Sequence, residues 1–80
     1  MNVDILAFGI AKEIFGNASV TVDLESETTV EHLKTALEKK YPALQKLGSY
    51  MIAVNNEYAE DKTMIASKDE IAVIPPVSGG

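Results

Sequence analysis

The fold is decided by residues 28–41, TTVEHLKTALEKKY, which Pro42 follows directly. Apolar side chains recur along this stretch at helical spacing and share one face: Val30, Leu33, Ala36, Leu37 and Tyr41. Thr28 can accept hydrogen bonds from the free N–H groups at the start, and Glu31, three residues on, can reach back, which predicts a capping box. Because Pro42 cannot continue a helix interior, the helix is expected to end at residues 40–41. We predict one long helix whose apolar stripe the rest of the chain must cover.

Short, largely apolar runs bounded by turn residues lie on both sides of this helix and predict the strands of a sheet, and residues 19–24 also alternate between apolar and polar. Two strands are expected upstream, over residues 3–8 and 19–24, as a hairpin-like pair joined by a short helix over residues 10–15. Downstream, strands are expected over residues 51–54, 58–59 and 70–74, with a short turn or helix at 44–48 and turns at 55–56, 60–62 and 67–69. The helix must cover one face of a mixed sheet of about four to five strands, with later strands beside the first. The predicted fold class is an α+β roll.

Composition excludes several classes of function. The 80-residue chain has no cysteine, which excludes disulfides, thiolate metal sites and a cysteine nucleophile. Its formal net charge of −5 argues against a nucleic-acid partner. No apolar run is long enough to span a bilayer and no N-terminal signal is visible, so we expect a cytoplasmic protein without a membrane partner. His32 lies off the apolar stripe without a metal-binding cluster, and is expected to be an exposed helix residue.

The end of the sequence, Ile74-Pro75-Pro76-Val77-Ser78-Gly79-Gly80, has no structural reason to belong to a globular core. Proline fixes φ and favours an extended backbone, whereas glycine leaves the tip without side chains. Residues 75–80 could reach roughly 20 Å when extended. We therefore divide the chain into a domain, residues 1–74, and a tail, residues 75–80. Such a tail can thread a narrow channel and place a terminal carboxylate in another protein's active site.

Strand parity predicts two different faces of the sheet. The face toward the helix is expected to carry Val3, Ile5, Ile52, Val54, Ile71 and Val73. The opposite face is expected to carry Leu6, Phe8, Met51, Ala53, Ala72 and Ile74. That second face would be an exposed apolar patch beside the base of the tail, and such patches mark protein contacts.

The predicted order of elements resembles the ubiquitin-like β-grasp fold. Residues 69–80, DEIAVIPPVSGG, resemble the C-terminus of molybdopterin synthase small subunits, a family of sulfur carriers that end in two prolines, a small stretch and Gly-Gly. Phe8 after the first strand, the pair Lys12-Glu13 and the pair Val54-Asn55 also fit this family, and the resemblance covers essentially the whole chain. Lys68 departs from the pattern, because the family often has glycine in the turn before the last strand.

The resemblance implies a mechanism centred on the Gly80 carboxylate. A ubiquitin-activating-type enzyme would use ATP to convert it to an acyl-adenylate, and sulfur would then replace AMP to give a thiocarboxylate. The tail would insert into the large subunit of a heterotetrameric synthase, where sulfur passes to the cyclic pyranopterin precursor of the molybdenum cofactor. Gly79 lets a tight site close around the backbone. The chain itself would bind no cofactor and have no activity alone.

The partner-binding residues follow from the resemblance and the parity argument together. In the tail they are Pro75, Pro76, Val77 and Ser78. On the domain, Phe8, Ile74 and Tyr58 are expected to contact the large subunit and the adenylating enzyme, with Lys12 as a rim charge. For Leu6 and Phe8, the alternative is a place in a second small cluster under a loop.

Three other functions remain compatible with the tail. The chain could be a ubiquitin-like modifier joined through Gly80 to lysines, and lysine-linked conjugates would favour that function. It could be a sulfur carrier for another pathway such as thiamine synthesis, although the Pro-Pro-Val-Ser spacer speaks against this. It could also be a plain β-grasp interaction module, whose binding would survive deletion of Gly80.

Overall fold

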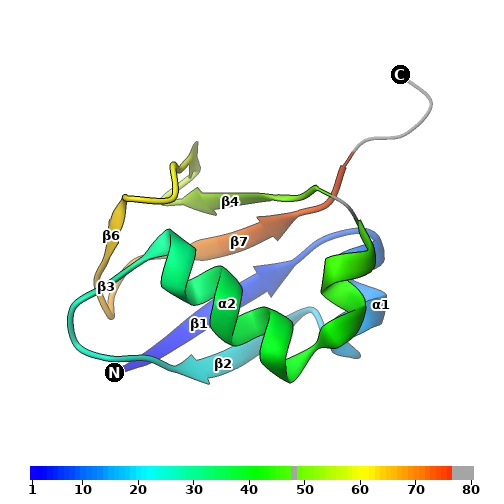
Figure 1. Cartoon of the computed structure of the whole chain (residues 1–80), viewed down its shortest axis with the longest axis horizontal. Helices are drawn as coiled ribbons and strands as arrows, with labels where there is room; N and C mark the ends of the chain where they lie inside the picture. The colour runs from blue at the N-terminus through cyan, green and yellow to red at the C-terminus, as the bar shows by residue number, and fades with distance from the viewer. Residues whose placement is uncertain (48, 77–80) are drawn as a thin grey trace.

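The computed structural model describes residues 1–47 and 49–76 (Figure 1). Its strands are β1 (Asn2–Ala7), β2 (Ser19–Asp23), β3 (Thr28–Thr29), β4 (Met51–Val54), β5 (Glu57–Tyr58), β6 (Met64–Ile65) and β7 (Ile71–Ile74). Its helices are α1 (Ile10–Phe15), α2 (Val30–Lys40) and the 3-10 helix η1 (Pro42–Leu47). The predicted long helix is confirmed, as are the predicted strands to within about two residues at each end.

Five strands form one mixed sheet in the order β2-β1-β7-β4-β5. β1 pairs antiparallel with β2 and parallel with β7, whereas β4 pairs antiparallel with both β7 and β5. The long connection through α2 therefore brings the last strand beside the first, as the sequence predicts. Figure 1 shows α2 lying across one face of this sheet, with α1 at the end where β1 and β7 finish.

A second sheet of two short strands was not predicted, and it corrects the predicted start of α2. Thr28 is 4% exposed and pairs with Ile65 across β3 and β6, so it is not the capping residue. Thr29 is the N-cap, and its hydroxyl accepts a 3.4 Å hydrogen bond from the His32 N–H. The predicted capping box of Thr28 and Glu31 is therefore wrong.

The loop before β6 supplies the physical reason. The N–H groups of Val30 and Glu31 donate to the carbonyls of Thr63 at 3.0 Å and Asp61 at 2.9 Å. Free donors in the first turn of a helix need partners, and here the backbone of a distant loop provides them. Lys34 reinforces this contact through a 3.0 Å ion pair with Asp61.

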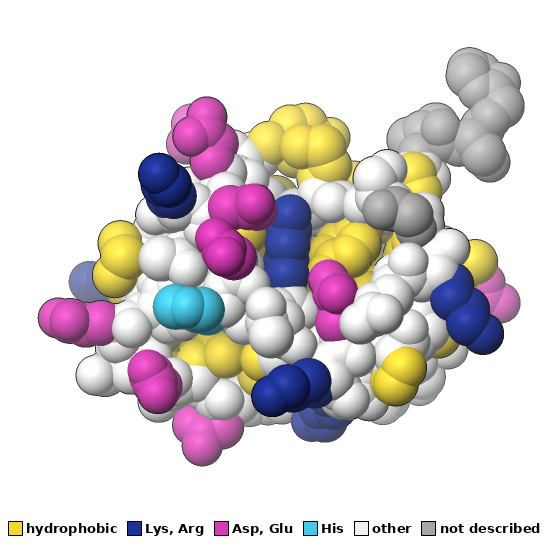
Figure 2. Space-filling view, in the orientation of Figure 1, with side chains coloured by type: hydrophobic (Ala, Val, Ile, Leu, Met, Phe, Trp, Pro, Cys, Tyr) yellow, Lys and Arg dark blue, Asp and Glu magenta, His cyan; other side chains and the backbone are white. Residues whose placement is uncertain are grey.

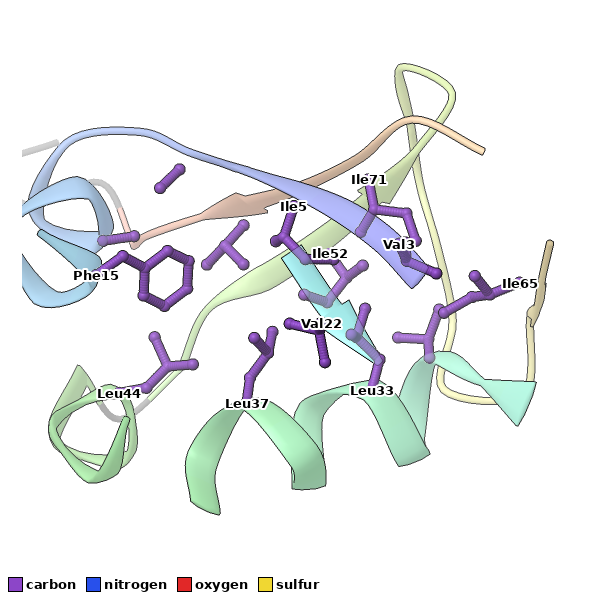
Figure 3. Close-up of a cluster of buried hydrophobic side chains, with 14 of the residues drawn as sticks. Val3, Ile5, Phe15, Val22, Leu33, Leu37, Leu44, Ile52, Ile65 and Ile71 are labelled. Atoms are coloured by element: carbon purple, nitrogen blue, oxygen red, sulfur yellow. The ribbon is translucent and has the colours of Figure 1, made fainter. Parts of the chain in front are cut away.

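The core lies between α2 and the inner face of the five-stranded sheet (Figure 3). Leu33 and Leu37 of α2 are fully buried, as are five residues of the facing strands: Val3, Ile5, Ile52, Ile71 and Val73. Val54 is half-buried against the same cluster. The parity predicted for the inner face is therefore confirmed. At the far end of α2, the rings of Phe15 and Tyr41 lie 4.6 Å apart between centroids and close the core.

Tyr50, in the segment that leads to β4, connects this segment to the surface of α2. Its hydroxyl donates to a carboxylate oxygen of Glu38, and the Lys34 ammonium lies 5.6 Å from its ring centroid. Burial first, and then the bond to Glu38, raise the pKa of the Tyr50 hydroxyl well above its ordinary value. The tyrosine therefore stays protonated and remains a hydrogen-bond donor.

Figure 2 looks onto the helix-bearing side, where acidic and basic side chains are spread around α2. His32 is exposed on this helix, as predicted. No described helix is long and apolar enough to cross a membrane.

Candidate functional site

The site is the outer face of the five-stranded sheet, on the side opposite α2. Strand register aligns one row of this face across four strands, since Leu6 pairs with Ala72, Ala72 with Ala53, and Ala53 with Tyr58. Met51 pairs with Ile74 in the next row. The residues predicted for the outer face therefore lie together, and none of the described helices covers them.

A shallow hollow of about 340 Å³ occupies this face. Its apolar lining consists of Leu6, Phe8, Ala53, Tyr58, Ala72 and Ile74. Phe8 is 50% exposed and Tyr58 is 69% exposed, so both rings stand at the surface instead of filling a core. The structure thus brings together the three aromatic and aliphatic residues predicted as anchors, and the alternative of a cluster under a loop is wrong for Phe8.

Two polar residues complete the lining, and neither was predicted as a site residue, although a turn was predicted at residues 55–56. Asn56 belongs to the turn between β4 and β5, where Asn55 and Asn56 adopt φ values of 53° and 69°. Asparagine tolerates this left-handed region better than other residues with side chains, which explains the tight turn. Glu70 precedes β7 and places the only carboxylate among the lining residues at the edge of the hollow.

The base of the tail adjoins the hollow. Ile74 is both the last residue of β7 and part of the lining, and Pro75 follows it half-buried while Pro76 is exposed. Gly9 has φ 55°, and a Cβ placed there would lie 3.3 Å from the Pro75 ring. Gly9 therefore lets the turn after β1 pass close to the tail base. This residue was missed because an isolated glycine in a sequence does not show what it lies against.

Other predicted site residues lie elsewhere. Val77, Ser78, Gly79 and Gly80 fall outside the described residues, so their roles stay predictions. Lys12 is exposed on α1 but does not line the hollow, and its role as a rim charge stays a prediction as well. Within residues 1–47 and 49–76, no group of three His, Asp or Glu side chains is arranged to hold a metal ion.

A hydrogen-bond network fixes the polar edge of the hollow. The Asn55 side chain accepts from the Glu70 N–H at 2.9 Å and donates to Asp69 at 3.0 Å. Asp69 also accepts from the Ala66 N–H at 2.8 Å. The Ala66 contact first, then Asn55 and nearby Lys68, hold the pKa of the Asp69 carboxyl below its ordinary value.

The same network bears on Lys68, which stands where the resemblance led us to expect glycine. The Asp69 N–H donates to the Ala66 carbonyl at 3.0 Å and closes the turn from within. Lys68 is not among the residues with positive φ, so the turn makes no demand for glycine at this position.

Asp69→Asn should make stability less dependent on acidity. Because folding lowers the pKa of the Asp69 carboxyl, its ionised form stabilises the folded state. This contribution is complete above the pKa of the unfolded chain, about 3.9, and is lost as pH falls through the pKa of the folded state. Because Asp69 lies near the surface, we expect the variant to lose less than about 1 kcal/mol at pH 7. Urea unfolding at pH 7 and near pH 3 measures this, with Glu27→Gln as an exposed control. A wild-type advantage that persists undiminished in acid would contradict the assignment.

The arrangement of strands and helix defines the class of protein. A mixed five-stranded sheet crossed by one long helix is a ubiquitin-like β-grasp fold, and solved structures with TM-scores of 0.85 and 0.86 share it. Residues 5–80 match the ThiS family. The chain belongs to this family, and the resemblance to sulfur-carrier subunits is confirmed by the relatives that follow.

The chain is 42% identical over 83 residues to a molybdopterin synthase sulfur carrier subunit of Caenorhabditis briggsae, covering 100% of this chain and 99% of that protein. It is also similar to SAMP1 of Haloferax volcanii, a small archaeal modifier protein, at a TM-score of 0.85, 30% identity and full coverage of both chains. A third similar structure comes from a complex of subunits 1 and 2 of the molybdopterin-converting factor of Helicobacter pylori. Its TM-score is 0.71, its identity 26%, and both chains are fully covered.

Proposed function

We propose that the chain is a sulfur carrier subunit of molybdopterin synthase and carries sulfur as a thiocarboxylate on Gly80. The observation that supports this most is the position of the tail base, which leaves the domain at the edge of an apolar hollow that no described helix covers. A partner that docks on the hollow is thereby placed beside the residues that lead to Gly80. The full-length similarity to a sulfur carrier subunit supports the same function.

The chemistry of the carrier needs only its C-terminus. A carboxylate is an unreactive acyl group until one oxygen becomes part of a leaving group. An activating enzyme of the ubiquitin-activating type joins the Gly80 carboxylate to the AMP portion of ATP and releases pyrophosphate. A sulfur donor then displaces AMP and leaves the thiocarboxylate. Since the chain contains no cysteine, a thiocarboxylate gives it a way to hold sulfur without a thiol side chain.

Transfer takes place in the large subunit. The tail enters that subunit and delivers sulfur to the cyclic pyranopterin precursor, while the large subunit provides the catalytic groups. Pro75 and Pro76 lower the entropy that the tail loses on docking, because proline restricts the free chain. The related subunits of the Helicobacter pylori factor form a complex, which supports this partnership. Both partner enzymes are intracellular in this scheme, so the carrier acts in the cytoplasm.

Intact mass spectrometry of the protein isolated from its host tests the proposal. The expected result is a species in which one terminal oxygen is exchanged for sulfur. A population that carries only the ordinary carboxylate, even when the host actively makes the cofactor, would contradict it.

A second function is favoured by the similarity to an archaeal modifier protein. As a modifier, the chain would be joined through Gly80 to lysine side chains of other proteins. Activation to the acyl-adenylate is the same in both functions, so only the product distinguishes them. Lysine-linked conjugates that form whether or not the large subunit is present would favour the modifier.

Phe8→Asp should weaken binding to the large subunit with little effect on folding. Phe8 is half exposed on the outer face, so its replacement removes an anchor without opening a core cavity. A charge placed in an apolar interface also carries a desolvation cost. We expect affinity to fall at least about tenfold, since truncated hot-spot residues cost about 2 kcal/mol or more. Calorimetric titration measures the affinity, and a melting curve of the free variant provides the control. A large drop in melting temperature would place Phe8 in the core.

A further inference from the structure

The hollow has a floor of small residues. Ala53 and Ala72 face each other across β4 and β7, and Leu6 pairs with Ala72 on the other side. Larger side chains stand around this floor, with Tyr58 on β5 and Phe8 after β1. Two neighbouring alanines between bulky residues leave room for a side chain that comes from outside.

The edge of the hollow away from the tail is acidic. Glu70 is exposed, and its backbone is fixed by Asn55, which accepts from the Glu70 N–H at 2.9 Å and donates its own N–H to the Glu70 carbonyl at 2.7 Å. Asp4 lies on the outer face of β1 and adds a second carboxylate to this edge. Its side chain accepts a 2.8 Å hydrogen bond from the Thr21 hydroxyl. No lysine is among the residues that line the hollow, and among the described residues Glu70 forms no ion pair.

We propose that this hollow recognises a protein surface that presents one aliphatic or aromatic side chain with a lysine or arginine beside it. The apolar side chain rests on Ala53 and Ala72, and the cation pairs with Glu70. The inference rests on the proposed function, because it takes the synthase large subunit as the protein that carries this pair.

Size and charge favour this occupant over others. About 340 Å³ lies near the lower limit of small-molecule sites, which span about 300–1,000 Å³, and the hollow is shallow. Interface energy concentrates where an anchor side chain fills a pocket and nearby contacts exclude water. A cation at the edge pairs with a carboxylate whose backbone is already fixed, so little conformational freedom is lost there. The formal net charge of −5 adds a general attraction for a basic partner.

Two substitutions test the two parts separately. Ala72→Leu fills the floor, and we expect it to weaken binding to the large subunit by at least about tenfold. Glu70→Lys reverses the charge at the edge, and we expect about a tenfold loss together with a weaker dependence of affinity on salt. Glu57→Lys is the matched control, since it changes net charge equally but Glu57 does not line the hollow. Calorimetric titration at low and high salt measures all four proteins, and melting curves show whether each is folded.

The outcomes separate this inference from the proposed function. If the wild-type chain binds the large subunit and both Ala72→Leu and Glu70→Lys bind equally well, the inference is wrong while the function stands. If Glu57→Lys weakens binding as much as Glu70→Lys, the effect is net charge alone and the edge contact is overturned. If the wild-type chain forms dimers that Ala72→Leu abolishes, a second copy covers the hollow and the inference is likewise overturned. A wild-type chain that fails to bind the large subunit would instead refute the proposed function.

Discussion

Deletion of Gly80 is expected to abolish sulfur transfer completely while the domain keeps its full stability. Among the described residues, the buried core includes none after Val73, so we expect the domain to keep its stability when Gly80 is deleted. In the proposed function, however, the reacting carbonyl belongs to Gly80. A chain ending at Gly79 presents its carboxylate one residue short, up to about 3.5 Å from the required position. Misplacement of this size is enough to remove the benefit of positioning.

Three measurements on the same protein make this test decisive. Reconstituted synthase reports sulfur transfer, calorimetric titration reports docking on the large subunit, and a melting curve reports folding. The deletion should abolish sulfur transfer, weaken docking on the large subunit only in part and leave the melting temperature unchanged. An extra alanine after Gly80 should also abolish transfer. Pro76→Ala is the control, because it retains length and both glycines and should slow transfer only modestly. Normal turnover by the deleted or extended chain would rule out the carrier function.

The main elements of the fold were predictable because each has a strong local signal. The stripe on α2 repeats at helical spacing, and β1, β4 and β7 are short, largely apolar runs bounded by turn residues. The small sheet had no such signal, since β3 and β6 are only two residues each. The error at Thr28 has the same origin. A threonine before a helix looks like a cap, but Thr28 pairs with Ile65, more than thirty residues away, and leaves Thr29 as the cap.

The apolar part of the site was predictable for a related reason. Parity alone places Phe8 and Ile74 on one face, and the parallel pairing of β1 with β7 brings them together. The polar part was not predictable, because Asn55 and Glu70 are joined only after β4 and β7 pair. Gly9 was not predictable for the same reason, since the need for glycine there comes from its close approach to Pro75, 66 residues later in the chain. Long-range contacts of this kind leave no periodic trace in a sequence.

Leu33→Ala is expected to cause one of the largest losses of stability among single substitutions in α2. Leu33 is fully buried at the centre of the helix stripe, where it faces the inner side of the sheet (Figure 3). Leucine-to-alanine changes in such places cost about 2–5 kcal/mol, because a cavity remains. The free energy of unfolding of an 80-residue domain is about 4–12 kcal/mol, so this is a large fraction of the total. Urea unfolding followed by circular dichroism measures the loss.

The effect of this substitution on function shows whether the domain only positions the tail or also takes part in sulfur transfer. Leu33 lies on the opposite side of the sheet from the hollow, so the folded variant should present the same docking surface and the same tail. At a temperature where it remains folded, we expect sulfur transfer per folded molecule to match the wild type. Thr35→Ala, an exposed change on the same helix, should alter stability by less than about 0.5 kcal/mol. If folded Leu33→Ala bound the large subunit normally but transferred no sulfur, the domain would have to do more than position its tail.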